Sequence, residues 1–186
     1  MRELSAFMNL TLNGYYAGPN GDLSWAHAGA DDEWNDFVKE NAAGGGVMLY
    51  GRVTYEMMIQ YWPTPVAEKN DPEVARQMNS LPKYVVSRTL QNPTWNNTKV
   101  IRDLLPEVRK LKDEAGPGIA ILGSGRIVAQ LAQENLIDAF QIVVQPVALG
   151  EGKTLFAGMM DKLSLRLANS RVFKNGNVVL SYEPAA

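Results

Sequence analysis

Short apolar runs that pass directly into turns and helical patterns recur along this chain, and this order restricts the possible folds more than any other feature. The runs at 47–50, 83–87 and 118–122 are too short for buried helices, so each predicts a buried strand. Patterns with helical spacing follow at 53–59 and at 127–132. Strands that alternate with helices form βαβ units, so we expect a mainly parallel sheet.

Three further strands and two loops are predicted from the remaining segments. Apolar runs at 3–10, 98–101 and 139–147 predict the strands. Glycine, proline and asparagine gather at 13–22, and prolines and a tryptophan gather at 61–72, so both segments are predicted as loops. The strands then have helices available to cover both faces of one sheet, which is a three-layer arrangement.

Two more helices are predicted from aspartates that cap a helix N-terminus. Asp31 or Asp32 precedes a helical pattern that three glycines end at 44–46. Asp103 precedes a second pattern whose apolar residues recur at helical spacing. Both helices are expected to pack against the sheet.

The C-terminal part has a different pattern, which predicts an antiparallel hairpin. Apolar and polar residues alternate at 163–173, and an apolar run follows at 178–182. Between them, Asn175-Gly176 is typical of a type I′ turn. We therefore expect one α/β domain over residues 1–186, with a mostly parallel mixed sheet flanked by helices and an antiparallel hairpin at its end.

Composition excludes several classes of function. The net charge is −2 and no basic cluster occurs, so neither nucleic acid nor a membrane surface is an expected partner. The chain has no cysteine and one histidine, which argues against disulfides, thiolate catalysis and a metal site. No apolar run approaches the length of a membrane span, so we expect a cytoplasmic protein.

A glycine-rich turn follows the strand at 118–122 and is suited to a phosphate group. The turn reads Leu122-Gly123-Ser124-Gly125-Arg126 and opens a helix, whose free N–H groups and dipole attract anions. The full dinucleotide fingerprint has a third glycine, where this chain has valine. The alternative interpretation is a tight turn before a packed helix.

Two other strand ends carry side chains that suit a phosphorylated dinucleotide. Gly51, Arg52 and Thr54 join a strand to a helix, although this segment also fits a helix with a surface arginine. Ser87 and Arg88 end the next strand, where an NADP 2′-phosphate prefers hydroxyl and guanidinium groups and an NAD ribose prefers a carboxylate. An exposed arginine at a strand end is the alternative. Because ligands bind at the carboxyl ends of parallel strands, the three segments together predict a dinucleotide site.

Aromatic residues beside glycines and prolines are candidates to stack on a flat substrate. The residues in question are Tyr16, Trp25, Trp34, Tyr55 and Trp62. The alternative for each is packing beneath a long loop. The five are therefore candidates to contact the substrate, with packing as the competing role.

Several segments together resemble the dihydrofolate reductase superfamily. Within it, the chain is similar to the branch of the C-terminal reductase domain of the bifunctional riboflavin-biosynthesis deaminase/reductase, RibD. The matching segments are 8–18, 50–56, 83–89, 121–125 and 145–153, which together extend over nearly the whole chain. The combination is specific for the branch, whereas no single segment is.

This resemblance implies a cofactor and a form of assembly. It implies a central mixed sheet, NADPH as the bound cofactor and a homodimer. By analogy, the segment at 51–54 and the glycine-rich turn at 123–125 flank the pyrophosphate, and Ser87 and Arg88 meet the 2′-phosphate. Hydride transfer then needs little acid–base chemistry from the protein, because the cofactor carries the reaction.

The resemblance also places the substrate end of the site. The loops at 13–25 and 149–156 are expected to shape it, and Asn9, Gly150 and Phe156 join Tyr16, Trp25, Tyr55 and Trp62 as expected substrate-binding residues. A small heterocycle is the expected ligand. The implied reaction reduces a pterin or a ribosylaminopyrimidine with NADPH.

One residue departs from the pattern of the family. Relatives commonly have Asp-Gly where this chain has Asn13-Gly14, which makes Asn13 the residue at the expected catalytic position. An amide forms hydrogen bonds but does not act as a general acid. Two alternatives follow: an NADP-binding protein without turnover, or a reductase of an unrelated small carbonyl compound or quinone.

Overall fold

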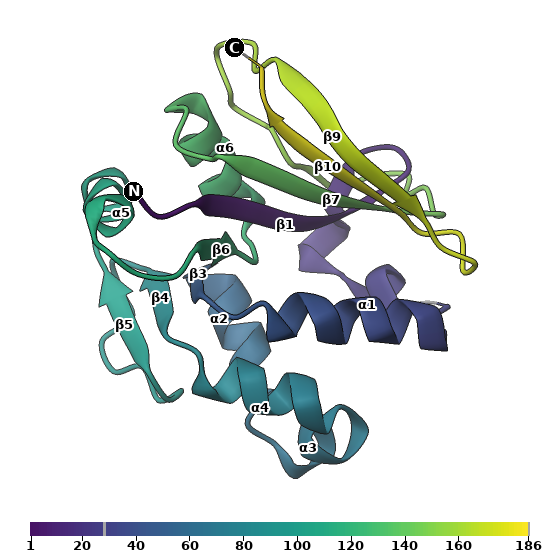
Figure 1. Cartoon of the computed structure of the whole chain (residues 1–186), viewed down its shortest axis with the longest axis horizontal. Helices are drawn as coiled ribbons and strands as arrows, with labels where there is room; N and C mark the ends of the chain where they lie inside the picture. Colours follow the sequence, from purple (N-terminus) through teal and green to yellow (C-terminus); the bar gives the residue numbers. More distant parts are fainter. Residues whose placement is uncertain (28, 186) are drawn as a thin grey trace.

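An eight-stranded mixed sheet forms the middle layer of the molecule (Figure 1). The computed structural model describes residues 1–27 and 29–185. Its strands are β1 (Leu4–Thr11), β3 (Val47–Gly51), β4 (Lys83–Val86), β5 (Thr98–Ile101), β6 (Ile119–Ile121), β7 (Ala139–Gln145), β9 (Leu165–Val172) and β10 (Val178–Pro184). Their order is β5-β4-β3-β6-β1-β7-β10-β9, parallel from β5 to β7 and antiparallel from there on. The predicted α/β fold with its terminal hairpin is confirmed.

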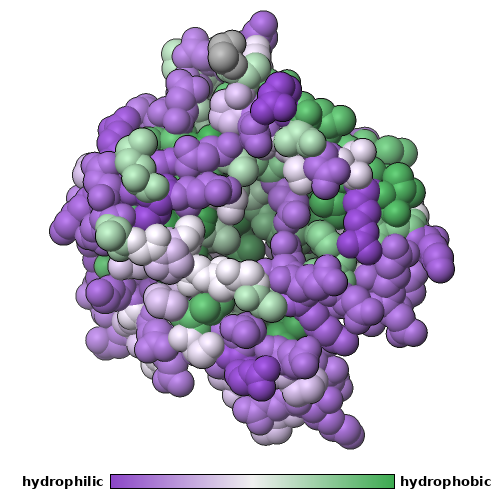
Figure 2. Space-filling view, viewed as in Figure 1, coloured by the Kyte–Doolittle hydropathy of each residue, from purple (hydrophilic) through white to green (hydrophobic). Residues whose placement is uncertain are grey.

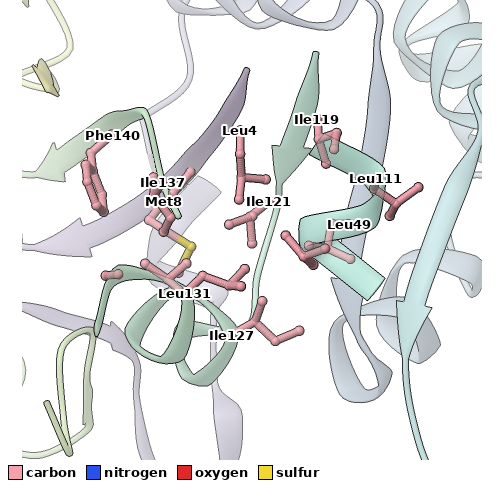
Figure 3. Close-up of a cluster of buried hydrophobic side chains, with 14 of the residues drawn as sticks. Leu4, Met8, Leu49, Leu111, Ile119, Ile121, Ile127, Leu131, Ile137 and Phe140 are labelled. Carbon is pink, nitrogen blue, oxygen red and sulfur yellow. The ribbon is translucent and has the colours of Figure 1, made fainter. Parts of the chain in front are cut away.

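Helices cover both faces of this sheet. They are α1 (Asp32–Ala43), α2 (Arg52–Ile59), α3 (Pro65–Asn70), α4 (Pro72–Ser80), α5 (Leu104–Asp113) and α6 (Gly125–Gln133). Successive side chains of a strand point to opposite faces, so Leu49 packs with α5 and α6 in the core of Figure 3, whereas Met48 and Tyr50 pack with α2 and α4 on the other face. Figure 2 shows that the outer surface in this view is mainly hydrophilic, with a hollow near its middle that has hydrophobic residues at its floor.

A second, two-stranded sheet joins two segments that lie far apart in the sequence. β2 (Tyr15–Ala17) pairs antiparallel with β8 (Lys153–Thr154). The prediction of 13–22 as a loop was therefore wrong at 15–17, because the partner that makes this segment a strand is not local. Short 3₁₀ helices follow β2, namely η1 (Pro19–Gly21) and η2 (Ser24–His27).

The prediction of 61–72 as a loop was also wrong in part. Helix α3 occupies Pro65–Asn70, and α4 begins at Pro72. Both prolines stand in the first turn of their helices, where the missing N–H group has no helical acceptor to lose. Thr64 caps α3, since its hydroxyl accepts a hydrogen bond from the N–H of Ala67 at 3.3 Å.

The terminal hairpin has a different turn from the predicted type I′. That turn needs positive φ at both central residues, and only Gly176 has one, at 90°. The N–H of Gly176 donates to the carbonyl oxygen of Phe173, and the N–H of Phe173 donates to that of Asn177. The loop therefore has three residues and ends in a glycine with left-handed backbone, a common alternative.

The helix caps and the last strands also differ in detail from the expectation. Asp31 caps α1 by accepting a hydrogen bond from the N–H of Trp34 at 2.8 Å. Asp103 stands at the N-cap of α5, as predicted, but its side chain makes no capping bond. The alternation at 163–173 predicts one buried face, yet β9 is largely exposed because it is the outermost strand of the sheet.

A buried lysine lies at the amino ends of the strands. Lys83 is fully buried and donates to the carbonyl oxygens of Asn79, Leu81 and Asn96 at 3.3, 2.7 and 3.1 Å. Its ammonium also lies 4.5 Å from the ring centroid of Trp95. A cavity of about 700 Å³ opens beside it, at the edge of the sheet opposite to the predicted site. Burial lowers the pKa of Lys83 to about 8.

This lowered pKa predicts a pH-dependent stability. Between about pH 8 and the ordinary lysine pKa of 10.5, only the unfolded chain holds the proton, so raising the pH favours the folded state. Relative to Lys83→Met, the free energy of unfolding should rise by about 1 kcal/mol between about pH 7 and pH 9. Urea denaturation at both pH values measures this difference. A Lys83 ¹³Cε resonance that titrates at the ordinary lysine value would contradict it.

Candidate functional site

The β3–α2 and β6–α6 junctions are locked together at the carboxyl edge of the sheet. The N–H of Gly51 donates to the carbonyl oxygen of Gly123 at 3.0 Å, and the N–H of Leu122 donates to that of Leu49 at 3.2 Å. These bonds continue the β3–β6 pairing past the end of β6. Two of the three predicted segments therefore form one continuous surface.

Glycines allow these junctions to approach so closely. A Cβ added to Gly51 would lie 3.0 Å from Oγ of Ser124, and one added to Gly123 would lie 3.0 Å from Oγ1 of Thr54. Gly123 also has a φ of 112°, a conformation that other residues rarely adopt. The peptide bond between Gly123 and Ser124 is cis.

The helices that leave the two junctions have free N-termini. Gly51 and Ser124 are the N-cap residues of α2 and α6, and neither caps its helix through a side chain. The first-turn N–H groups and the helix dipole therefore favour an anion here. Arg52 begins α2, but its guanidinium pairs with the Glu56 carboxylate at 2.8 Å. An exposed pair of this kind is worth less than about 1 kcal/mol, so a phosphate can compete for Arg52.

The third predicted segment lies at the end of β4. The hydroxyl of Ser87 is buried and accepts hydrogen bonds from the N–H groups of Thr89 and Leu90 at 3.2 and 2.9 Å. Arg88 is exposed beside it. The guanidinium of Arg102 donates to the carbonyl oxygen of Ser87 at 2.6 Å, which places a second cation at this strand end. Arg102 was not among the residues predicted from the sequence, although it directly follows the strand at 98–101.

Strand order brings these groups into a row. β5, β4, β3 and β6 are neighbours, so their carboxyl ends place Arg102, Ser87, Gly51 and Gly123 in succession along one edge. The predicted cofactor-binding segments therefore lie next to one another at the carboxyl edge of the sheet.

Tyr16 covers the first turn of α6. A Cβ added to Gly125 would lie 2.4 Å from Cε1 of Tyr16, so the ring rests directly on this glycine. Burial raises the pKa of Tyr16, and the positive charge of Arg126 opposes that rise. The predicted substrate residue Tyr16 thus borders the predicted cofactor residues Gly125 and Arg126.

The Asn13 side chain holds two loops together. Its Nδ2 donates to the carbonyl oxygen of Leu149 at 2.7 Å, and its Oδ1 accepts from the N–H of Leu149 at 3.2 Å and from the hydroxyl of Thr11 at 2.9 Å. Both ends of the amide are therefore engaged within the protein. This arrangement gives Asn13 a structural role, and the catalytic role expected at this position stays a prediction.

Replacing Asn13 by aspartate tests this clamp. A carboxylate cannot donate to the Leu149 carbonyl oxygen and would face it with like charge, so Asn13→Asp should cost about 1–2 kcal/mol of stability. Urea denaturation measures the loss. Leu12→Ala, a change at the neighbouring exposed residue, is the control, and an equally small effect of both changes would contradict the clamp.

Four of the aromatic candidates pack against other parts of the protein. Tyr55 is buried, and its hydroxyl accepts a hydrogen bond from the N–H of Trp95 at 3.1 Å. Trp62 is half-buried and packs against the same cluster. Trp25 is buried within η2, and Trp34 is buried in α1. These contacts favour the packing interpretation that the sequence left open for them.

The other substrate candidates lie nearer the surface. Phe156 is exposed, with its ring centroid 6.2 Å from that of Phe140. Gly150 is exposed, and a Cβ added to it would meet no atom within 4 Å. Asn9 is half-buried near the end of β1 and accepts a hydrogen bond from Gln145, a residue that the sequence analysis did not select. No local pattern marks Gln145, because its partner is 136 positions away.

Comparison with known proteins identifies the family. The model of the RibD C-terminal domain matches residues 2–179. The chain belongs to the RibD C-terminal domain family. Its curated relatives include the Bacillus subtilis "Uncharacterized protein YyaP", which is 32% identical over 182 residues, covering 97% of this chain and 94% of the relative. A second, "Uncharacterized protein YwjB" from the same organism, is 26% identical over 176 residues, with 92% of each chain covered.

Solved structures share the fold of this RibD C-terminal domain. A putative riboflavin biosynthesis protein from Shewanella sp. PV-4 has a TM-score of 0.71 at 20% identity, with 99% of each chain covered. A pyrimidine reductase-like protein from Corynebacterium diphtheriae has a TM-score of 0.67 at 12% identity, covering 100% of this chain and 92% of that one. Within residues 1–27 and 29–185, the domain has no helix both long and apolar enough to span a membrane.

Proposed function

We propose that this RibD C-terminal domain is an NADPH-dependent oxidoreductase that reduces a small heterocycle, either a pterin or a ribosylaminopyrimidine. The observation that carries the proposal is the interlocked pair of βα junctions, with Gly51 bonded to Gly123, beside the two guanidinium groups at the ends of β4 and β5. A solved relative of the same fold, from Thermotoga maritima, is described as a deaminase and 5-amino-6-(5-phosphoribosylamino)uracil reductase.

The residues present fit NADPH. The glycines at 51, 123 and 125 leave no space for a side chain, which suits a backbone surface that approaches a pyrophosphate. The uncapped N-termini of α2 and α6 offer N–H groups to its phosphates, and Arg88 and Arg102 suit the 2′-phosphate. When bound, NADPH supplies the hydride, and the protein orients the substrate and excludes water.

Titration with NADPH tests the proposal. Nicotinamide fluorescence should rise to saturation, and absorbance should then fall when dihydrofolate or a ribosylaminopyrimidine is added. A lack of binding at millimolar NADPH would overturn the proposal. Oxidation of NADPH only by quinones or simple carbonyl compounds would favour the alternative that this is a reductase of those substrates.

The engaged amide of Asn13 favours a second candidate function. Asn13 is an amide whose two ends are bonded to Leu149, so it does not act as a general acid at the position where relatives commonly have aspartate. The chain would then bind NADP without turnover. Saturable NADPH binding with no oxidation by pterins, pyrimidines, quinones or carbonyl compounds would support this candidate over the reductase.

A homodimer in the cytoplasm is the proposed form of the protein. The outermost strand β9 exposes Leu167 by 50% and Val172 by 73%. An open sheet edge with apolar side chains is suited to pairing with a second copy. Light scattering during gel filtration measures the mass, and a monomer at micromolar concentration would contradict the dimer.

A further inference from the structure

Gln145 fixes which end of the Asn9 amide faces the interior. Gln145 is 1% exposed at the end of β7, and its Nε2 donates to Oδ1 of Asn9 at 3.2 Å and to the carbonyl oxygen of Ala26 at 3.4 Å. A main-chain carbonyl can only accept, so the Ala26 contact requires Nε2 on this side of Gln145. Asn9 must then turn its own carbonyl oxygen toward Gln145.

The opposite end of Asn9 is consequently a donor. Its Nδ2 has two N–H groups, and it has no acceptor in the part of the chain that the structure describes. β6 ends its pairing with β1 at Ala6 and Ile121, three positions before Asn9. The loop from Leu122 to α6 leaves β1 at this point. From Phe7 on, β1 has no paired strand on its β6 side among the described residues, and Asn9 lies in this unpaired part near the loop.

We infer that Gln145 is a positioning residue that holds Asn9 as a hydrogen-bond donor toward the bound ligand. The inference rests on the proposed function and names the chemistry of its site: a carbonyl oxygen or an unprotonated ring nitrogen faces Asn9. A ligand that presents an N–H group there is disfavoured, because two donors would face each other in a half-buried place. The acceptor belongs either to an oxo-substituted heterocyclic substrate or to the nicotinamide carboxamide.

Asn9→Asp removes the N–H donor of Asn9 and keeps the size and the acceptor oxygen of its side chain. The aspartate still accepts from Gln145, so folding is preserved, but it no longer donates to a ligand. We expect binding of the acceptor-bearing ligand to weaken by about 100-fold, with stability within about 0.5 kcal/mol of wild type. Weaker NADPH binding assigns the acceptor to the carboxamide, and a higher KM for dihydrofolate with unchanged NADPH binding assigns it to the substrate.

Two variants of Gln145 test positioning directly. Gln145→Glu replaces the donor by an acceptor, so Asn9 should turn its Nδ2 inward and bind as poorly as Asn9→Asp. Gln145→Met releases Asn9 without reversing it, so the loss should be smaller, about 10-fold. Gln141→Met is the matched control, because Gln141 lies on the same strand and accepts from Asn41 instead. It should leave binding unchanged.

The side-chain amide of Asn9 gives a readout that does not need turnover. Its ¹⁵N–¹H resonances, assigned by their loss in Asn9→Asp, should shift when NADPH or dihydrofolate is added to the wild type. If the main-chain resonance of Gly125 shifts while the Asn9 amide does not, the inference fails and the cofactor site stands. If neither resonance moves with either probe, the proposed function and the inference fail together.

Discussion

Replacing Gly125 by valine is expected to lower the free energy of unfolding by about 3 kcal/mol, at the upper end of the usual cost of overpacking. A Cβ at Gly125 would lie 2.4 Å from Cε1 and 2.7 Å from Cδ1 of Tyr16. Valine adds two methyl groups to this Cβ, so the Tyr16 ring must leave its place on α6. Urea denaturation followed by circular dichroism measures the loss.

The double variant Tyr16→Ala/Gly125→Val separates crowding from other effects. Without the ring, the valine meets no steric barrier from Tyr16, and its helix propensity is slightly better than that of glycine. The valine should therefore cost little in the Tyr16→Ala background. Gly150→Val is the control, because an added Cβ there meets no atom within 4 Å. Equal losses from Gly125→Val in both backgrounds would contradict the contact.

Arg88→Ala is expected to weaken NADPH binding by about 100-fold and NADH binding by less than about 3-fold, because a charge-assisted bond to the 2′-phosphate would be lost. NADH lacks the 2′-phosphate, so it forms no such bond with Arg88 that the substitution could remove. Arg88 is exposed beside the buried Ser87, and its removal leaves no cavity in the core. Nicotinamide fluorescence titrations with both cofactors measure the two ratios.

Two other arginines serve as comparisons for Arg88. Arg109 pairs with Glu134 at 2.7 Å, away from the β4 end, so Arg109→Ala should change neither affinity. Arg102→Ala should weaken NADPH binding too, although its bond to the Ser87 carbonyl oxygen adds a structural loss. Equal losses of NADPH and NADH binding in Arg88→Ala would show that Arg88 does not read the 2′-phosphate.

Most strands and helices could be predicted because their signals are local. The apolar run at 47–50 is fully buried in β3, and the pattern at 127–132 lies in α6. The prolines at the start of α3 and α4 were interpreted as loop residues. Proline ends a helix in some places and begins one in others, and the sequence alone does not distinguish the two cases. The turn at Asn175-Gly176 was misjudged because its geometry depends on how Phe173 is anchored, with its ring 5.1 Å from those of Trp34 and Phe37.

The location of the candidate site could be predicted from the sequence, but the contacts between its side chains could not. Parallel strands must end at a common edge, so the strand ends at Ser87 and Gly51 were expected to meet there. The partners of Asn13 and Asn9 lie 136 positions away, and nothing near either residue indicates them. Likewise, burial of Tyr55 against Trp95 depends on tertiary packing, which no local pattern records.

The pairing of β2 with β8 has a consequence for any attempt to change ligand preference. Tyr15 and Thr154 face each other across this small sheet, and Asn13 bonds to Leu149 at its open end. If only β2 or only β8 were replaced by the segment of a relative, the other strand would still carry the side chains that pair with the original sequence. Ligand preference should therefore be transferable between members of the family only when both segments are exchanged together.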